Sequence, residues 1–178
     1  LGCFGIAACV DKPAGAIFEL NCESAPVAGH EEFIQLANDL AEALAASSGV
    51  DSADALLALN SPSKEGTTLK DQLDELYGRM REVFKIGRFQ RYEGATGGYS
   101  HNSGTVSGVL VNVTGGTDEA AKDIAMHVAA MKPAVLSKDD IDAAAVAKER
   151  EILSDAARKE GKPENIIEKM VEGRMRQF

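Results

Sequence analysis

The sequence predicts an α+β protein: two pseudo-repeated lobes of antiparallel sheet packed with helices, plus an antiparallel helical hairpin. Apolar, β-rich segments at 15–21 and 108–114 are each followed by a loop and an amphipathic helix, which indicates an internal repeat. Each lobe is too small to bury a good core alone, so the two are expected to pack on one another. We divide the chain into an N-terminal lobe (1–94), a C-terminal lobe (95–137) and the helical hairpin (138–178).

The N-terminal lobe opens with a predicted β-hairpin. Gly5–Val10 and Ala16–Asn21 are the strands, joined by a turn that contains Pro and Gly. Cys22–His30 is expected to be a loop. Glu31–Ala46 is expected to be a helix, because acids open it and its apolar residues share one face. That face consists of Phe33, Leu36, Ala37, Leu40 and Leu44.

More helix is predicted after a stretch of small and polar residues. Ala53–Leu59 has the pattern of a short helix. From Leu69 the apolar residues follow a heptad-like seam, long enough for antiparallel packing. The seam consists of Leu69, Leu73, Leu76, Met80 and Val83. Gly87 is expected to mark a break before a strand at Arg88–Tyr92.

The C-terminal lobe repeats the plan. Gly97–His101 and Val106–Val113 predict a second hairpin around a turn at Asn102-Ser103-Gly104. The helix that follows begins at the N-cap Thr117 and stops at Pro133. Its core face is predicted from helical spacing: Ala121, Ile124, Ala125, Val128 and Ala129.

The same helix is apolar outside its core face. His127 is the only polar side chain between Ile124 and Met131, and Met126 lies beside it. A helix that is apolar nearly all round is covered on more than one side. Either another part of this chain or a partner protein supplies the cover, so Met126, His127 and Met131 form a candidate interface.

The final segment predicts two charged amphipathic helices. Ser137 and Asp140 have nearly the pattern of a capping box and open a helix from Asp139 to about Lys159. Gly161-Lys162-Pro163 ends it, and Pro163 suits the first turn of the next helix. The residues expected to face inward there are Ile166, Ile167, Met170 and Val171.

Composition and charge restrict the partners. A net charge of −9, a pI near 4.9 and the absence of Trp argue against nucleic acid. The apolar start, Leu1–Val10, is too short to span a bilayer, so no membrane partner is expected, and the absence of a starting Met suggests a fragment. Cys3, Cys9 and Cys22 have no zinc-like spacing and suit buried thiols in a reducing cytosol, so a cytoplasmic location is expected.

No catalytic constellation emerges from the sequence. The histidines lie far apart without ligand-spaced carboxylates or thiols, so neither a metal nor a cofactor is expected. Ser100 and Ser103 beside His101 lack an orienting acid, and the Gly-rich loops lack a Walker lysine. His101 is either a partner contact at the hairpin tip or a solvated loop residue. Met80 belongs either to the helix seam or to a contact surface.

Several motifs resemble translation elongation factor Ts, the guanine-nucleotide exchange factor of elongation factor Tu. The resemblance covers essentially the whole chain, and its last motif is long and specific. The matching segments are Glu19-Leu-Asn-Cys-Glu23, Ser107-Gly-Val-Leu-Val111, Asp123-Ile-Ala-Met-His-Val-Ala-Ala-Met-Lys-Pro133, Lys148-Glu-Arg-Glu-Ile-Leu153 and Gly161-Lys-Pro-Glu-Asn-Ile-Ile-Glu-Lys-Met-Val-Glu-Gly-Arg-Met175.

The resemblance implies a non-enzymatic factor that binds elongation factor Tu, GDP-bound or nucleotide-free, through specific residues. The family's Thr-Asp-Phe-Val loop falls on Ser24, Ala25, Pro26 and Val27. The family's Lys-Ile-Gly-Glu-Asn-Ile motif aligns without gaps onto Arg79–Phe84, which puts Met80 in the isoleucine position, and the Tyr-x-His hairpin matches Tyr99-Ser100-His101. The family's N-terminal helical domain has no counterpart here.

Two other functions stay open. The Ala25-Pro26 pair lacks the carboxylate and the aromatic ring of the family loop, so a docking module with weak or no exchange activity is the alternative. The apolar helix faces also allow a homodimeric structural protein.

Overall fold

The structure is a computed structural model that describes residues 1–101 and 106–175. The chain forms two compact units, Leu1–Lys132 and Pro133–Phe178. The first unit contains two antiparallel sheets together with helices, so the predicted α+β class is confirmed. The first unit contains the predicted N-terminal lobe and the predicted C-terminal lobe up to Lys132, and residues 133–137 fall in the second unit.

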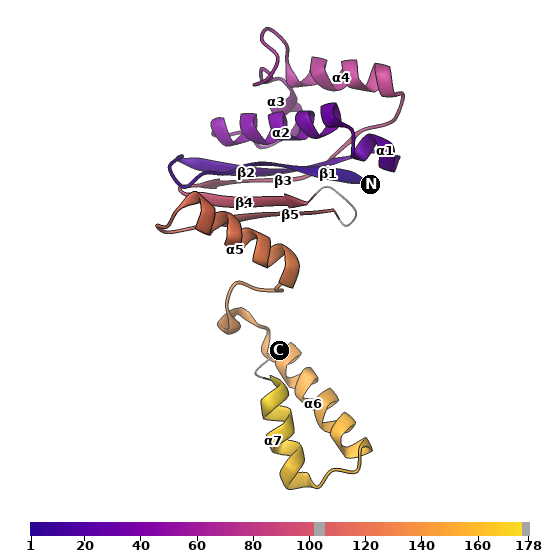
Figure 1. Cartoon of the computed structure of the whole chain (residues 1–178), viewed down its shortest axis with the longest axis vertical. Coiled ribbons are helices and arrows are strands. Elements are labelled where there is room, and N and C mark those ends of the chain that lie inside the picture. Colours follow the sequence, from indigo (N-terminus) through magenta and orange to yellow (C-terminus); the bar gives the residue numbers. More distant parts are fainter. Residues whose placement is uncertain (102–105, 176–178) are drawn as a thin grey trace. The chain divides into compact units, whose positions relative to one another are not determined.

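The first lobe is a three-stranded antiparallel sheet covered by helices (Figure 1). Its strands are β1 (Gly2–Ala7), β2 (Ala14–Asn21) and β3 (Lys85–Glu93), in the order β1-β2-β3. Helix α2 (Glu31–Ala46) lies on one face of this sheet, with α3 (Ala53–Leu57) and α4 (Leu69–Met80) beyond it. The predicted face of α2 is confirmed, since all five of its residues are buried.

The second lobe is a two-stranded antiparallel sheet of β4 (Thr96–His101) and β5 (Ser107–Asn112) with α5 (Asp118–Met131) packed on it. The residues of the predicted turn, 102–104, lie outside the described residues. The Thr117 hydroxyl accepts a hydrogen bond from the Ala120 amide, which confirms Thr117 as the N-cap.

The two sheets pack face to face, as predicted for the two lobes (Figure 1). Glycine makes this close approach of the sheets feasible. A Cβ atom added to Gly108 in β5 would lie 2.4 Å from Cγ of Phe4 in β1, and one added to Gly98 would lie 2.3 Å from Cγ2 of Ile6. No larger residue fits at either position without displacing the neighbouring sheet.

Gly87 does not break the chain, contrary to the sequence prediction. It lies within β3, where the pairing with β2 shifts between Phe18 and Leu20. Gly87 and Arg88 stand opposite the single residue Glu19, which is the geometry of a β-bulge. An isolated Gly in a strand pattern can mark either the end of a strand or a β-bulge, and here the pairing with β2 shows that it is a bulge.

Three further predictions for the first unit are wrong at particular residues. The expected loop Cys22–His30 contains a four-residue helix, α1 (Ala25–Ala28). Val83 lies outside α4, and its side chain is exposed. Ile124 is 52% exposed because α5 contacts its sheet through the small residues Ala121 and Ala125.

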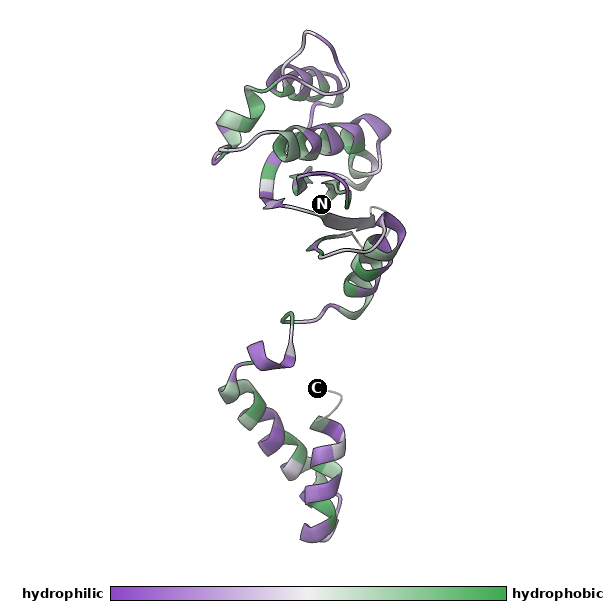
Figure 2. Ribbon diagram, turned by 90° about the vertical axis from the view of Figure 1, so that its left-hand side faces the viewer, coloured by the Kyte–Doolittle hydropathy of each residue, from purple (hydrophilic) through white to green (hydrophobic). Residues whose placement is uncertain are grey.

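The second unit is a helical hairpin, as predicted. Its helices are α6 (Ala143–Lys159) and α7 (Glu164–Met175), and Figure 2 shows both banded in hydrophobic and hydrophilic colours. The prediction that the first helix runs without a break from Asp139 is wrong. The Ser137–Asp140 capping box caps the start of a separate 3₁₀ turn, η1 (Lys138–Asp140), and α6 begins only at Ala143. Ile166 is exposed, whereas a small core consists of Ala157, Ile167 and Val171, with Leu153 and Met175 packed against it.

Candidate partner-binding site

The segment Ser24–Val27 contains the N-cap and the first three residues of α1, shortly after the end of β2. Ser24 is the N-cap, and Pro26 stands in the first turn, where its fixed φ suits a helix and its missing N–H costs no hydrogen bond. Ala25 and Pro26 are exposed, whereas Val27 packs against the main core. The two residues at the positions of the family's Asp-Phe pair therefore face solvent.

The residues that hold this segment in place come from beyond the end of α4. The Glu82 carboxylate accepts hydrogen bonds from the Glu23 amide at 3.2 Å and the Ser24 amide at 3.0 Å, and a third from the Ser24 hydroxyl. The Glu23 carboxylate in turn accepts one from the Val83 amide at 3.3 Å. Glu82 is not among the site residues predicted from the sequence, although it occupies the glutamate position of the Lys-Ile-Gly-Glu pattern.

Met80 is the last residue of α4 and packs, half-buried, against the main core. The next residue, Arg81, has φ 56° and ψ 34°, a left-handed backbone that favours glycine. In the ungapped alignment, Arg81 occupies the glycine position of the Lys-Ile-Gly motif. The alternative match, Lys85-Ile86-Gly87, lies in β3. The backbone therefore favours the ungapped register.

His101 ends β4, and its side chain is exposed. Its Nδ1 lies 3.1 Å from the Tyr99 hydroxyl, and the two rings stack with centroids 6.3 Å apart. When the phenol donates to Nδ1, the proton of the neutral ring is on Nε2, which becomes a donor for a partner. Tyr99 thus fixes the orientation of the imidazole.

The structure brings α1, the end of α4 and His101 to the same end of the double sheet. Bonds through Glu82 join the first two. Val106, just before β5, lines a surface hollow together with Leu1 and Asn21. The start of β5 therefore lies beside the end of β2, and His101 pairs with Ser107 there. In Figure 1 the end of β4, the start of β5 and α1 are all on the right of the first unit.

Helix α5 presents the residues of the other candidate interface. Met126 is 41% exposed and Met131 67% exposed, and His127 is exposed as well. Ile124, Met126 and Met131 are therefore large apolar side chains exposed on this helix. The ribbon of α5 in Figure 2 carries hydrophobic colour along much of its length. No described residue of the first unit buries them.

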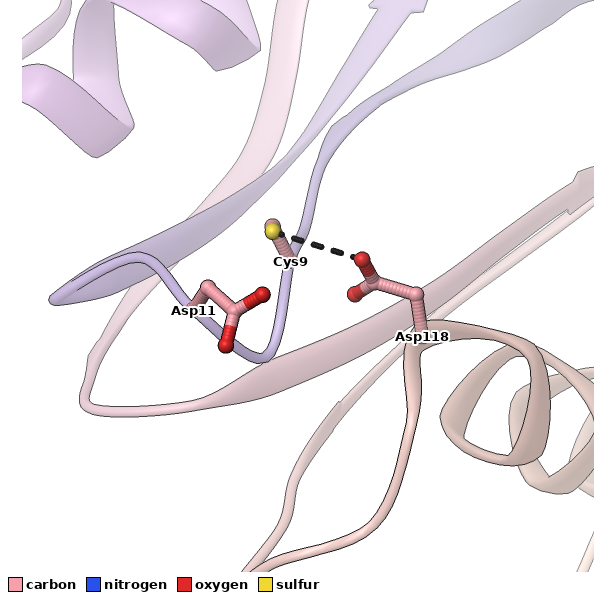
Figure 3. Close-up of side chains that lie close together, drawn as sticks. All are labelled: Cys9, Asp11 and Asp118. Atoms are coloured by element: carbon pink, nitrogen blue, oxygen red, sulfur yellow. Dashed lines mark hydrogen bonds between the residues drawn. The ribbon is translucent and has the colours of Figure 1, made fainter.

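A cluster of metal-ligand types that sequence spacing did not reveal joins the β1–β2 turn to α5 (Figure 3). Ligand atoms of Cys9, Asp11 and Asp118 all lie within 4.8 Å of one another. Both oxygens of Asp118 are engaged: one accepts from the Val10 amide at 2.8 Å, the other from the Cys9 thiol at 3.5 Å. These two hydrogen bonds make Asp118 a structural link between the lobes. The carboxylate also lies at the N-terminus of α5, where the helix dipole favours a negative charge.

The other two cysteines are buried beneath the same end of the sheet as α1. Burial, with the neighbouring Cys22 as a smaller cause, raises the pKa of Cys3 to about 12. Burial also raises the pKa of Cys22, and the negative charge of Glu82 adds to that shift. Burial thus favours the protonated form of both thiols, which is the poorly nucleophilic form.

Sequence comparisons identify the family of this chain. The family profile described as Elongation factor TS matches residues 26–178. The chain belongs to the elongation factor Ts family. Elongation factor Ts of Herminiimonas arsenicoxydans is 40% identical over 173 residues, and that of Ralstonia nicotianae is 41% identical over 174 residues. Elongation factor Ts of Methylococcus capsulatus is 41% identical over 171 residues.

The elongation factor Ts relatives are longer than this chain. The first two alignments cover 97% of the chain but only 58% and 57% of those proteins, and the third covers 94% and 57%. The chain therefore spans less than three fifths of the length of these relatives. Among its described residues, no helix has the length and apolar character needed to cross a membrane.

Proposed function

We propose that this chain binds elongation factor Tu and promotes the release of GDP during translation elongation in the cytoplasm. The observation that carries the proposal is the common location of three segments that match the family's contact motifs. Ser24–Val27, Met80 and His101 belong to different elements, yet they lie at one end of the double sheet. A partner can therefore contact all three at once.

The proposed mechanism is allosteric and forms no covalent bond. The factor binds the nucleotide-free partner more tightly than the nucleotide-bound one, so by linkage it weakens nucleotide binding by the same factor. Met80 and His101 dock the partner, and α1 acts on the nucleotide site. Pro26 is a compact, rigid wedge because its φ is fixed. In the family, the Asp-Phe pair presses between helices of the partner's G domain and disturbs its magnesium and phosphate sites. With no carboxylate at Ala25, α1 acts there through the bulk of Pro26 alone.

A docking module without exchange activity is the second candidate. The observation that favours it is the pair Ala25-Pro26, which offers neither charge nor an aromatic ring on the exposed side of α1. Such a module would bind elongation factor Tu and leave the nucleotide in place.

One experiment separates the two functions. The release of a fluorescent GDP analogue from elongation factor Tu is followed with and without this chain, and binding is measured in parallel. Accelerated release supports the exchange factor. Binding without acceleration supports the docking module, and the absence of binding contradicts both.

His101 offers a sharper test of the docking geometry. His101→Ala should weaken binding by roughly 1–3 kcal/mol, since an interface hydrogen-bonding group is lost. Tyr99→Phe is the matched variant: it keeps the ring but not the hydroxyl 3.1 Å from Nδ1, so a smaller loss is expected. Titration of elongation factor Tu with each variant measures both effects. Unchanged affinity of the His101→Ala variant would return His101 to the role of a solvated loop residue.

A homodimer through α5 is a further candidate assembly, because Ile124, Met126 and Met131 are exposed. Sedimentation of the chain alone would detect it.

A further inference from the structure

The loop after β2 and the loop after α4 are fastened together by reciprocal hydrogen bonds. Ser24 and Glu82 are 58 positions apart, yet the Glu82 carboxylate accepts hydrogen bonds from both the amide and the hydroxyl of Ser24. The Glu82 carboxylate also accepts a hydrogen bond from the Glu23 amide, and the Glu23 carboxylate accepts one from the Val83 amide. We call this set of four hydrogen bonds the Glu82 clasp.

Helix α1 depends on contacts from outside itself. It has four residues, and a single helical turn is not stable alone. A serine N-cap normally accepts a hydrogen bond from its own helix, but Ser24 makes no such bond and its hydroxyl donates to Glu82 instead. The clasp therefore fixes the start of α1, while the buried Ala28 fixes its end.

The backbone at the end of α4 aims Glu82 at this target. Arg81 adopts the left-handed conformation, and its amide donates to the Tyr77 carbonyl at 2.8 Å. This reverses the chain directly after Met80. Glu82 is half-buried, and hydrogen bonds to a carboxylate are about twice as strong as those between neutral groups. Only Arg81 stands between the proposed docking residue Met80 and the clasp.

We propose that Glu82 is a positioning residue that holds α1 and the end of α4 as one rigid surface, so that docking at Met80 delivers Pro26 to the nucleotide site of the partner. This inference rests on the proposed exchange function. A preorganised segment loses no further freedom on binding, so the clasp increases the fraction of complexes in which α1 acts. Met80 and His101 still dock the partner when the clasp is broken.

Glu82→Gln tests this role with little change in size. In the unmodified chain, Oε2 of Glu82 accepts from both amides and Oε1 accepts from the Ser24 hydroxyl. The variant loses the negative charge and keeps only one acceptor oxygen for these three donors. The rate of GDP release at saturating factor should fall about tenfold, which corresponds to roughly 1.4 kcal/mol. The Kd for elongation factor Tu should change by less than about threefold. Glu65→Gln is the matched control and should change neither quantity, because Glu65 is an exposed loop glutamate.

Amide hydrogen exchange in the chain alone tests the clasp without elongation factor Tu. The amides of Glu23 and Ser24 should exchange faster in the Glu82→Gln variant, while those of α2 keep their protection and show that the variant is folded. Ser24→Ala removes the hydroxyl bond only, so a smaller fall in release rate, about two- to threefold, is expected.

The outcomes distinguish the two proposals. Unchanged exchange of the 23–24 amides would overturn the clasp, and a release rate equal to that of the unmodified chain would overturn the positioning role. A Kd raised about tenfold, with the release rate at saturating factor unchanged, would make Glu82 a docking residue and would also overturn it. If the unmodified chain does not accelerate release, the exchange function is wrong, while the amide measurement still decides whether the clasp exists.

Discussion

The two lobes of the first unit follow one plan but bury different side chains. In the first lobe, α2 contributes Phe33, Leu36 and Leu40, each 0% exposed. In the second lobe, α5 buries only Ala121 and Ala125 and leaves Ile124 half exposed. The repeat therefore defines the topology of both lobes and not the depth of their cores. The first lobe supplies the stability, and the second keeps large apolar side chains available for contact.

Truncating one side chain in each lobe is the strongest way to break this comparison. Leu36→Ala should destabilise the protein by about 3 kcal/mol, because it removes transfer energy and leaves a cavity in the main core. Ile124→Ala should change stability by less than about 0.5 kcal/mol, since the side chain is largely in water. Urea unfolding of both variants measures the difference. Equal losses would show that α5 has a core as deep as that of α2.

The sheet interface offers the next largest effect. Gly108→Ala should cost about 2 kcal/mol, because the new methyl group would meet Phe4 at 2.4–2.7 Å and force the sheets apart. Gly78→Ala, in α4, is the control: nothing lies within 4 Å of the added methyl group, and alanine favours a helix. Thermal unfolding of the pair should therefore shift in opposite directions, and a shift in the same direction would contradict this packing.

A residue with a left-handed backbone conformation ends one helix in each lobe, and replacing it should have a smaller effect on stability. Arg81 ends α4 with φ 56°, and Lys132 ends α5 with φ 49°. Arg81→Gly and Lys132→Gly should each stabilise the protein by about 1 kcal/mol, because glycine adopts this backbone without a steric cost. Urea unfolding provides the measurement. Destabilisation by Arg81→Gly would show that the Arg81 side chain contributes more than its backbone costs.

The β-bulge of the first lobe should produce the smallest effect, visible only as a pH dependence. A hydrogen bond from Arg88, chiefly the 2.9 Å bond from Nε, holds the pKa of Glu19 below its ordinary value near 4.5. The stabilisation is therefore complete above that value and is lost as the pH falls through the lower pKa of the folded state.

Glu19→Gln provides the comparison for this pH dependence. Its urea midpoint should be lower than that of the unmodified chain at pH 6, and the two should converge as the pH falls through the lowered pKa of Glu19. A difference that stays constant over this range would mean that the carboxylate charge of Glu19 has no role.

Much of the fold follows from the sequence, because helical period, caps and turn residues act locally. The exact range of α2 and the Thr117 cap belong to this class. The errors concern contacts between distant segments. Gly87 forms a bulge because β2 lies beside it, and Ile124 is exposed because α5 uses its alanines against the sheet.

The candidate site shows the same limit. The motifs located Ser24–Val27, Met80 and His101, yet nothing local indicates that these three segments meet at one end. Glu82 could not be found from spacing, since its partners Glu23 and Ser24 are nearly sixty positions away and only the folded β2–β3 pairing brings them together. The acidic link at Asp118 was missed for the same reason.

The most direct test of a single docking end is a hydrogen-exchange footprint of the chain bound to elongation factor Tu. We expect new protection at residues 23–28, 80–84 and 99–101 and none at the β1–β2 turn. That turn lies at the opposite end of the sheet (Figure 1). Protection at the β1–β2 turn instead of these three segments would contradict the single docking end.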